Sequence, residues 1–330
     1  MGRKLDILVP VYNESSKTIK PLLDSISIQQ NVDMNEIGVI ICNDGGTFNL
    51  NNSDVDIKKY PFEIEYHECK HKGVSATRNA CLDKSLADYV MFCDADDMFY
   101  NACGLYIVFH EIDNEGFDTL SSIFIEETRH PETKKPIYIT REMDSTFVHG
   151  KVHNRKFLIN NNIRWNDNLT IHEDSYFNCL CQRLAKDFKY CQAPFYLWKW
   201  RDESVCRHDE KYILKTYNNM LDSNTALVNE FLDRRRKEDA QYFATSMIFD
   251  AYYTLCKDEW WADENSDYKR SVELRFKKYY EDFKYLFESI PNEIKNQIIV
   301  GIRNRMFGEG LMLEKITFED WIKHITSLED

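Results

Sequence analysis

Short apolar runs separated by helical segments constrain the fold of this chain more than any other feature. The runs Leu5–Val11, Ile37–Cys42 and Tyr89–Cys93 are apolar almost throughout, and Phe62–Tyr66 supplies a further strand. Runs of this length and composition are typical of strands buried on both faces of a parallel sheet. A helix is expected between the first two, over about residues 17–30. The alternation therefore predicts a doubly wound α/β sheet.

Carboxylates follow two of these strands directly. Asp44 comes after the second run, and Asp94, Asp96 and Asp97 come after Tyr89–Cys93. The carboxyl ends of strands are where open α/β sheets bind ligands. Two carboxylates one residue apart can hold a hard divalent cation, which can in turn hold a diphosphate. An isolated motif of this kind is more often a solvated loop or a helix cap, so the rest of the chain has to decide.

The composition and the motifs that are missing argue against several classes of function. The chain has 330 residues and a formal net charge of −13, and an acidic surface disfavours binding to nucleic-acid backbones. No strand is followed by either of the common Gly-rich phosphate-binding loops, and the hydrolase motif G-x-S-x-G is absent. No run approaches the roughly 20 apolar residues that span a bilayer. Ten cysteines and no signal peptide predict thiols in a reducing cytoplasm.

The last third of the chain has a different pattern. From about residue 209 apolar residues recur at near-helical spacing, as at Ile213, Tyr217 and Leu221. We expect two domains, residues 1–208 and 209–330. The second is a helical domain with two possible roles. One is structural, through packing or homo-oligomerisation, and the other is the binding of an acceptor.

Five motifs stand in a specific order along the first domain. They are Val9-Pro-Val-Tyr-Asn13, Asn43-Asp-Gly-Gly46, Lys72-Gly-Val-Ser-Ala-Thr-Arg-Asn79, Asp94-Ala-Asp-Asp97 and Glu173-Asp174. Their order and rough spacing resemble those of family 2 glycosyltransferases, over about residues 3–205. The resemblance implies the GT-A fold, a Rossmann-like, mostly parallel sheet with helices on both faces, followed here by the helical region.

The resemblance also implies a donor-nucleotide site. Its residues lie in or directly after the first four motifs and are Pro10, Tyr12, Glu14, Asp44, Lys72, Arg78 and Asp94. Asp44 matches the residue that reads the base, and Asp94 matches a contact to the donor ribose or sugar. Asn43 stands where the family has Asp, and Gly46 where it has Ser, so the base is left open. Asp97 has no assigned role.

Metal and catalytic roles are implied in the same way. Asp96 matches the metal ligand, with His208 as a second candidate, and the cofactor is Mn²⁺ or Mg²⁺, since both prefer oxygen ligands. Asp174 resembles the catalytic base, and Glu173 beside it contacts the acceptor or orients the site. A hydroxyl nucleophile needs a carboxylate within hydrogen-bond reach, and a diphosphate leaving group needs its charge neutralised.

Aromatic residues near the end of the first domain have two interpretations. Tyr196, Trp198 and Trp200 alternate along the chain. The two tryptophans are candidates for an acceptor or sugar platform, because aromatic faces stack on sugar rings. A spacing of two is equally that of one buried strand face. His208 is likewise either a ligand or a structural histidine.

The residues together predict a metal-dependent, inverting glycosyltransferase. It moves a sugar from a nucleotide-diphosphate donor, UDP-sugar favoured, to a hydroxyl of a glycan, cell-wall polymer, protein or modified DNA by single displacement. One alternative is a sugar-phosphate nucleotidyltransferase, although Val11–Ser15 lacks the Gly-rich, basic first loop that such enzymes use. The other is a catalytically silent nucleotide-sugar binding module.

Overall fold

The computed structural model of the protein describes residues 2–142, 144, 146–202, 204, 212–256, 261, 266–308 and 317–329. The chain divides into two compact units, Met1–Val205 and Cys206–Asp330. His208 and the expected boundary between residues 208 and 209 lie outside the described residues, so both stay predictions.

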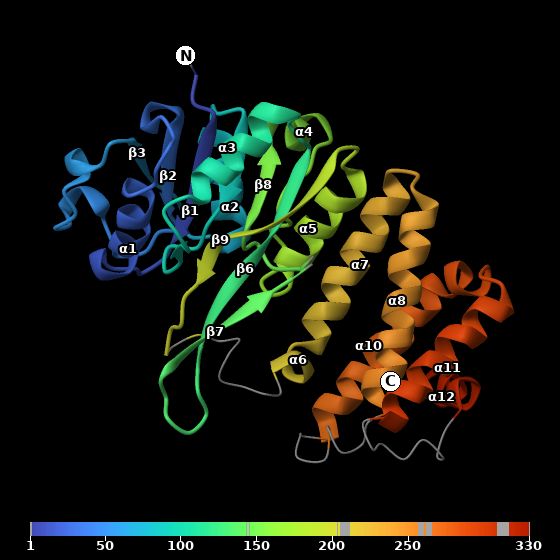
Figure 1. The fold of residues 1–330 in the computed structure, drawn as a ribbon. Coiled ribbons are helices and arrows are strands. Elements are labelled where there is room, and N and C mark those ends of the chain that lie inside the picture. The colour runs from blue at the N-terminus through green and yellow to red at the C-terminus, as the bar shows by residue number, and fades with distance from the viewer. Residues whose placement is uncertain are drawn as a thin grey trace. The chain divides into compact units, whose positions relative to one another are not determined.

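The first unit contains a mixed sheet, and one half of it is parallel (Figure 1). The strands of this half lie in the order β3-β2-β1-β4 and are β1 (Leu5–Val11), β2 (Ile37–Asn43), β3 (Glu63–Glu68) and β4 (Tyr89–Phe92). Each adjacent pair is parallel. The strands predicted from the apolar runs are therefore confirmed, and Asp44 and Asp94 lie beyond the carboxyl ends of β2 and β4, the two strands that flank β1.

The other half of the sheet is mostly antiparallel and continues in the order β8-β6-β9-β5, with β7 paired to β6. Its strands are β5 (Met98–Phe99), β6 (Thr119–Arg129), β7 (Pro136–Arg141), β8 (Lys151–Asn154) and β9 (Phe188–Trp198). β8 joins the halves, because it pairs antiparallel with both β4 and β6. β9 pairs parallel with β6 and antiparallel with β5, and its Tyr196 lies beside Asp97 in the loop after β4.

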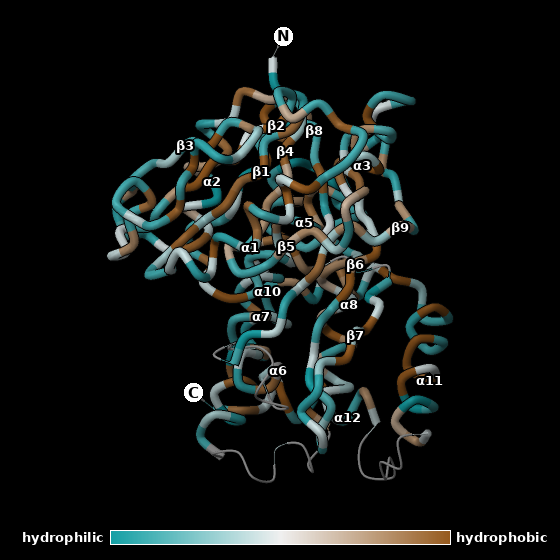
Figure 2. Tube along the Cα trace, turned by 60° about the vertical axis from the view of Figure 1, so that its left-hand side comes forward, coloured by the Kyte–Doolittle hydropathy of each residue, from teal (hydrophilic) through white to brown (hydrophobic). Residues whose placement is uncertain are grey.

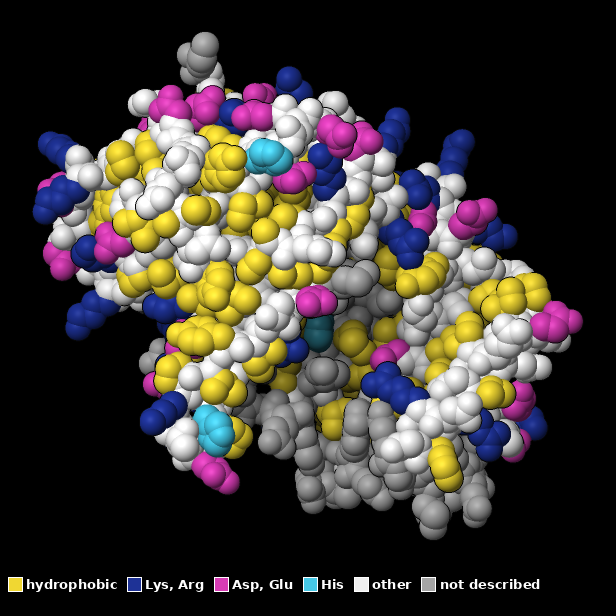
Figure 3. All heavy atoms as spheres, in the orientation of Figure 1, with side chains coloured by type: hydrophobic (Ala, Val, Ile, Leu, Met, Phe, Trp, Pro, Cys, Tyr) yellow, Lys and Arg dark blue, Asp and Glu magenta, His cyan; other side chains and the backbone are white. Residues whose placement is uncertain are grey.

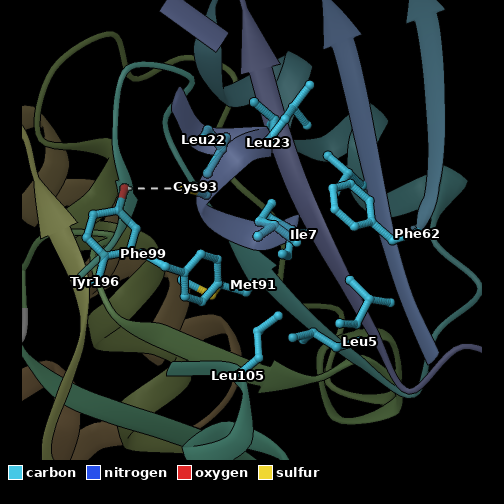
Figure 4. Packing of buried hydrophobic residues seen from close by; sticks show 14 of the residues in the cluster. Leu5, Ile7, Leu22, Leu23, Phe62, Met91, Cys93, Phe99, Leu105 and Tyr196 are labelled. Atoms are coloured by element: carbon cyan, nitrogen blue, oxygen red, sulfur yellow. Dashed lines mark hydrogen bonds between the residues drawn. The ribbon is translucent and has the colours of Figure 1, made fainter. Parts of the chain in front are cut away.

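Helices cover both faces of the sheet, as predicted. They are α1 (Ser16–Ser27), α2 (Val74–Lys84), α3 (Gly104–Asn114), α4 (Arg155–Asn160) and α5 (Glu173–Leu184), with 3₁₀ turns at Met34–Glu36, Leu50–Asn52 and Ile57–Lys59. Successive strand residues point to opposite faces. Ile7 and Met91 accordingly pack with Leu22 of α1 and Leu105 of α3 in one core (Figure 4).

The opposite face of the sheet carries α2 and α5. Phe92 of β4 makes edge contacts with Phe177 of α5 and with Trp165, at ring-centroid distances of 5.5 and 5.1 Å. Trp165 and Phe177 stack at 4.1 Å. This aromatic cluster fixes the N-terminal end of α5, which begins at Glu173, against the sheet.

The second unit is helical, which confirms the expected helical region. Its helices are α6 (Tyr212–Lys215), α7 (Tyr217–Asp233), α8 (Lys237–Leu255), α10 (Ser266–Glu288), α11 (Asn292–Gly308) and α12 (Phe318–Thr326). Tyr252, Phe276 and Trp321 join three of them in one aromatic core. Hydrophobic bands also run along α11 (Figure 2), where Ile294 and Ile298 are exposed.

The hydropathy of the helices and the distribution of surface charge both agree with the polar composition of the chain. None of the described helices combines the length and the apolar character that crossing a membrane requires. On the face drawn in Figure 3, basic and acidic side chains are interspersed and no single basic patch forms.

Candidate active site

One buried arginine joins the carboxylates of two predicted motifs. Arg78 of α2, only 3% exposed, donates from Nη1 to Asp174 Oδ1 at 2.8 Å and to Glu173 Oε1 at 3.0 Å. Its Nη2 donates to Asp94 Oδ1 at 3.1 Å. The guanidinium lies 4.4 Å from the ring centre of Trp165. Acids from two segments of the sequence, Asp94 in one and Glu173 and Asp174 in the other, therefore share one cation.

The backbone at the start of α5 directs the side chains of Glu173 and Asp174 toward Arg78. His172, which precedes α5, has φ 62° and ψ 19°, in the left-handed region that non-glycine residues rarely adopt. Glu173 and Asp174 then form the first turn of the helix, where the helix dipole favours negative charge. Strained residues of this kind cluster at functional sites.

The environment of Asp174 changes its acid–base properties. Burial raises the pKa of the Asp174 carboxyl to about 7, and the charges of Glu173 and Asp94 add to the rise, while Arg78 and the Val148 N–H oppose it. For Arg78, burial opposes the charged form, but the charges of Asp174, Asp94 and Glu173 outweigh it and raise the pKa of the guanidinium. Asp174 is thus poised to exchange a proton near neutral pH.

Asp96 faces a different cation. Arg201 donates from Nη1 to Asp96 Oδ2 at 3.2 Å and to Glu14 Oε1 at 3.1 Å. Burial, then the charge of Asp94, raises the pKa of Asp96, although Arg201 opposes this. The side chains of Asp94 and Asp96 are 33% and 31% exposed, so both remain open to a ligand from solvent.

Asp97 is buried, and its hydrogen bonds are to other parts of the protein. It is 1% exposed, accepts from Tyr196 Oη at 2.5 Å and accepts from the Lys199 N–H at 2.9 Å. Burial and the charges of Asp96 and Asp94 raise the pKa of Asp97 well above its usual range. Tyr196 Oη also lies 3.7 Å from Cys93 Sγ, the interaction dashed in Figure 4. Asp97 therefore ties the loop after β4 to β9.

Two sets of side chains are candidates for holding a divalent cation here. Ligand atoms of Asp94, Asp97 and His149 lie within 4.8 Å of one another. The other candidate is Asp96, the predicted metal ligand, together with Asp94, which was predicted as a donor contact. The guanidinium of Arg201 pairs with Asp96 at this place. Carboxylate oxygens suit Mn²⁺ or Mg²⁺. Only the second set consists of partly exposed side chains, which a metal shared with a diphosphate requires.

The loop after β2 is shaped by Asp44. Its carboxylate accepts from the backbone N–H groups of Lys72 and Gly73, at 2.8 and 2.9 Å, and lies 2.9 Å from His71 Nδ1. Gly73 has φ 94°, which a side chain would strain. His71 stacks on Tyr12 with ring centres 4.7 Å apart. The two rings and Asp44 thus form one polar and aromatic cluster at the sheet edge.

The hydrogen bonds of Asn43 explain why this position is Asn and not the Asp of the family motif. Its Nδ2 group donates to the carbonyls of Gly46 and Phe48 and to Glu68 Oε2, at 2.8–2.9 Å. All three partners are acceptors, so a carboxylate at this buried position would repel them. Asn13 Oδ1 accepts from the Thr47 N–H at 3.0 Å and so connects the first and second loops.

Comparison with known proteins identifies the family. The model of the family described as Glycosyl transferase family 2 matches residues 6–176, which is just over half of the chain. The chain belongs to glycosyltransferase family 2.

Curated relatives agree with this family assignment. Glycosyltransferase GlyA of Streptococcus pneumoniae is 26% identical over 251 residues, covering 68% of this chain and 35% of the relative. An uncharacterized glycosyltransferase of Rickettsia bellii is 32% identical over 125 residues, covering 38% of this chain and 17% of the relative. The chain therefore spans only a fraction of the length of the relatives that it matches.

Solved structures share the fold. Residues 1–349 of S. aureus TarS in complex with UDP-GlcNAc match with a TM-score of 0.65 at 15% identity, covering 94% of this chain and 93% of that one. The complex of the same protein with UDP gives a TM-score of 0.63 at 15% identity, covering 95% and 94%. The likeness establishes the fold, and with it the GT-A assignment.

Within this family 2 domain, some of the predicted site residues lie together and others do not. Asp94, Arg78, Glu173 and Asp174 are brought together, and Glu14 joins Asp96 through Arg201. The other donor residues lie around the first two loops: Pro10 near the end of β1, with Tyr12 and Lys72 exposed beyond it. None of the donor roles is tested by this arrangement, so all remain predictions.

The two tryptophans lie in different settings. Trp198 packs against Phe147 and His149, with ring centres 5.1 and 4.8 Å away, which favours the strand-face interpretation. Trp200 is half-buried and donates from Nε1 to Asp202 at 2.7 Å. A sugar contact by either ring stays a prediction.

Two residues of the site carry no sequence signal: His149 and Trp165 belong to no motif. Arg201 is different, because its segment, Trp198–Ser204, made it one of two candidates for a phosphate contact, with Arg207, which lies outside the described residues. The spacing of Trp165, eight residues before Glu173, offers no periodic hint. Their roles depend on contacts between distant segments.

Proposed function

We propose that this chain is a metal-dependent, inverting glycosyltransferase that uses a UDP-sugar and transfers the sugar to an acceptor hydroxyl by single displacement. Membership of glycosyltransferase family 2 supports the reaction class. The geometry around Arg78 supports the residue roles, with Asp174 as the general base.

The observation that carries the proposal is the shared guanidinium. Arg78 lies 2.8 Å from Asp174 and 3.1 Å from Asp94, so the proposed base and the proposed donor contact are held within the width of one side chain. Single displacement needs the acceptor hydroxyl, its base and the sugar carbon to meet at one point. A carboxyl with a pKa of about 7 is matched to accept the hydroxyl proton at neutral pH.

The acids after β4 suit the diphosphate side of the reaction. We propose that Asp96, with Asp94, holds Mn²⁺ or Mg²⁺, whose positive charge would stabilise the departing diphosphate. Arg201 pairs with Asp96 and Glu14, and from that place it can also donate to phosphate oxygens. The buried Asp97 holds the loop through Tyr196.

The loops after β1 and β2 suit a nucleoside. Tyr12 is 49% exposed and stacked on His71, and an exposed aromatic pair can extend its stack onto a pyrimidine. Asp44 lies beside this pair. The UDP complexes of TarS, a protein of the same fold, support uridine as the base of the donor.

The remaining assignments are proposals of the same kind. We place the protein in the cytoplasm, because the described cysteines are free thiols, which fits a reducing compartment. We assign acceptor binding or homo-oligomerisation to residues 209–330. The acceptor is proposed only as a hydroxyl-bearing glycan, cell-wall polymer, protein or modified DNA.

The test is a donor screen. UDP-, GDP- and TDP-sugars are incubated with the protein and Mn²⁺, Mg²⁺ or EDTA, and release of the nucleoside diphosphate is measured. We expect metal-dependent turnover of one UDP-sugar, abolished in Asp174→Asn, which should still bind UDP. Release of pyrophosphate from an NTP and a sugar phosphate would instead identify a nucleotidyltransferase. Absence of any nucleotide affinity with Mn²⁺ present would contradict both.

A further inference from the structure

The peptide group between Phe147 and Val148 connects the proposed base to the protein interior. Its N–H, on Val148, donates to Asp174 Oδ2 at 3.2 Å. The opposite carboxylate oxygen, Oδ1, is the one that Arg78 holds. Asp174 is therefore fixed from two sides, by a guanidinium and by one backbone N–H.

The carbonyl of the same peptide is held by two side chains. Lys151 Nζ donates to Phe147 O, and Asn178 Nδ2 donates to it at 2.9 Å. Asn178 also donates to Thr146 O at 2.7 Å. Asp174 and Asn178 are four residues apart on α5, so they lie on one face of the helix and attach the strand-entry segment to it at two points.

Lys151 is an unusual residue for this position. It is 4% exposed at the start of β8, and its nearest carboxylate oxygen, Oδ1 of Asp144, is 3.8 Å away. Burial lowers the pKa of Lys151. A buried ammonium whose ion pair is as long as 3.8 Å gains less from that pair than one in direct contact, so its burial is costly.

The chain approaches Lys151 through a constrained turn. Gly150 has φ 64°, and a Cβ atom there would lie 2.6 Å from Ser122 Oγ. Any other residue would be strained and would clash with β6. The turn from Val148 to Lys151 is therefore fixed by sequence, and it sets the direction in which the lysine re-enters the core.

We propose that Lys151 and Asn178 are positioning residues for Asp174 and act through the Phe147–Val148 peptide, holding its carbonyl so that its N–H stays directed at the carboxylate. This inference rests on the proposed function of Asp174 as the base. An ammonium bound to a carbonyl also polarises the peptide and strengthens hydrogen bonding by its N–H. The other charges that face Asp174 are those of Arg78, Glu173 and Asp94.

The consequence is a change in proton affinity rather than in donor binding. Without Lys151 the carboxylate loses a nearby positive charge and a well-directed donor, and both losses favour the protonated acid. We expect the pKa of Asp174 to rise by roughly one unit in Lys151→Met. Under conditions more acidic than the pKa, the deprotonated fraction then falls about tenfold.

The first experiment compares Lys151→Met with Lys186→Met, a matched change of an exposed lysine just beyond α5. Hydrolysis of the best UDP-sugar is measured from pH 5.5 to 9. For Lys151→Met we expect kcat about tenfold lower at pH 6, close to wild type at pH 9, with an unchanged KM for the donor. Lys186→Met should match wild type throughout. Equal losses at both pH values, or wild-type rates at pH 6, would overturn the inference.

A small cavity allows chemical rescue. A volume of about 90 Å³ is lined by Lys151, His153 and Asn178 and flanked by the partly exposed rings of Phe188 and Tyr190. Burial lowers the pKa of His153 to about 3, so this imidazole is neutral and cannot replace the ammonium. In Lys151→Ala, n-propylamine should restore activity at pH 6, and it should not stimulate the wild type. Failure of rescue in a folded variant would argue against the role of the ammonium.

A second readout separates this inference from the proposed function. In protein labelled with [4-¹³C]aspartate, the Asp174 signal is assigned by its loss in Asp174→Asn and titrated by NMR. An upward shift in Lys151→Met and a smaller one in Asn178→Ala support positioning even if no UDP-sugar is turned over, in which case only the proposed function fails. Titration of both variants as in wild type overturns the inference whatever the activity.

Discussion

Oδ1 of Asp174 lies 2.8 Å from Nη1 of Arg78, and the side chains of the two residues are 20% and 4% exposed, respectively. The same guanidinium binds Glu173 and Asp94, so one positive charge is shared among three acids. A single cation cannot fully neutralise three carboxylates. One of them therefore binds a proton readily, and burial makes that acid Asp174.

The first prediction is a pH dependence. Because the pKa of Asp174 is raised to about 7, the carboxyl is protonated below that pH and cannot accept the hydroxyl proton. We expect kcat/KM to increase tenfold per pH unit up to about 7 and then level off. The measurement is donor turnover from pH 5 to 9. A profile that stays flat from pH 5 to 8 would remove Asp174 as the base.

The second prediction concerns stability. Arg78→Met leaves Asp94, Glu173 and Asp174 without their shared cation, and breaking a buried ion pair in this way costs about 3–5 kcal/mol. Urea denaturation measures the loss in the free energy of unfolding. Arg164→Met is the matched control, because its pair with Asp83 is largely exposed and should contribute less than about 1 kcal/mol. Equal losses in the two variants would contradict the central place given to Arg78.

The third prediction distinguishes the two sets of metal ligands. Asp96→Asn should weaken Mn²⁺ binding in the presence of UDP by at least about tenfold, because a charged ligand is lost. His149→Phe keeps the ring that stacks on Phe147 and removes the nitrogens, and it should leave Mn²⁺ affinity almost unchanged. Calorimetry gives both values. The reverse result would assign the ion to Asp94, Asp97 and His149.

The fourth prediction concerns the base of the donor. Tyr12→Ala removes an exposed ring stacked on His71, and UDP should bind about tenfold more weakly with Mn²⁺ present. Tyr106→Ala is the control, since Tyr106 on α3 is 45% exposed and also faces a histidine ring, that of His110. If both variants bind UDP as wild type does, the nucleoside lies elsewhere.

Much of this arrangement could be predicted because it depends on local patterns. The apolar run ending in Asp94 gave both a strand and the edge at which it ends, since parallel strands place their carboxyl ends together. The same reasoning placed Asp44 at that edge. Family resemblance then added Asp174, which the fold brings to the same place.

The contacts that organise the site could not be predicted in the same way. Arg78 reaches Asp174 across 96 positions of sequence, and Asp97 reaches Tyr196 across 99. No periodicity encodes such pairs, because they depend on how β9 and α5 pack onto the sheet. His149 is a single histidine before a glycine, and only the fold shows that it stacks on Phe147.

The substitution of Asn43 for a family aspartate illustrates a further difficulty. From sequence it looked like an open question about the base. In the structure its amide donates to three acceptors that surround it, so its identity is explained by the turn it holds. A departure from a family motif can therefore report on loop geometry before it reports on ligand choice.

Sharing of one guanidinium by three acids has a consequence for mutational analysis. Neutralising Glu173 or Asp94 removes a competitor for Arg78, so each substitution also changes the proton affinity of Asp174. The effects of single substitutions at these positions should not add, because residues in one ion-pair network are energetically coupled. The loss of activity measured for a single alanine substitution at Glu173 or Asp94 would therefore include its indirect effect on Asp174, and only double-mutant cycles will separate the contributions.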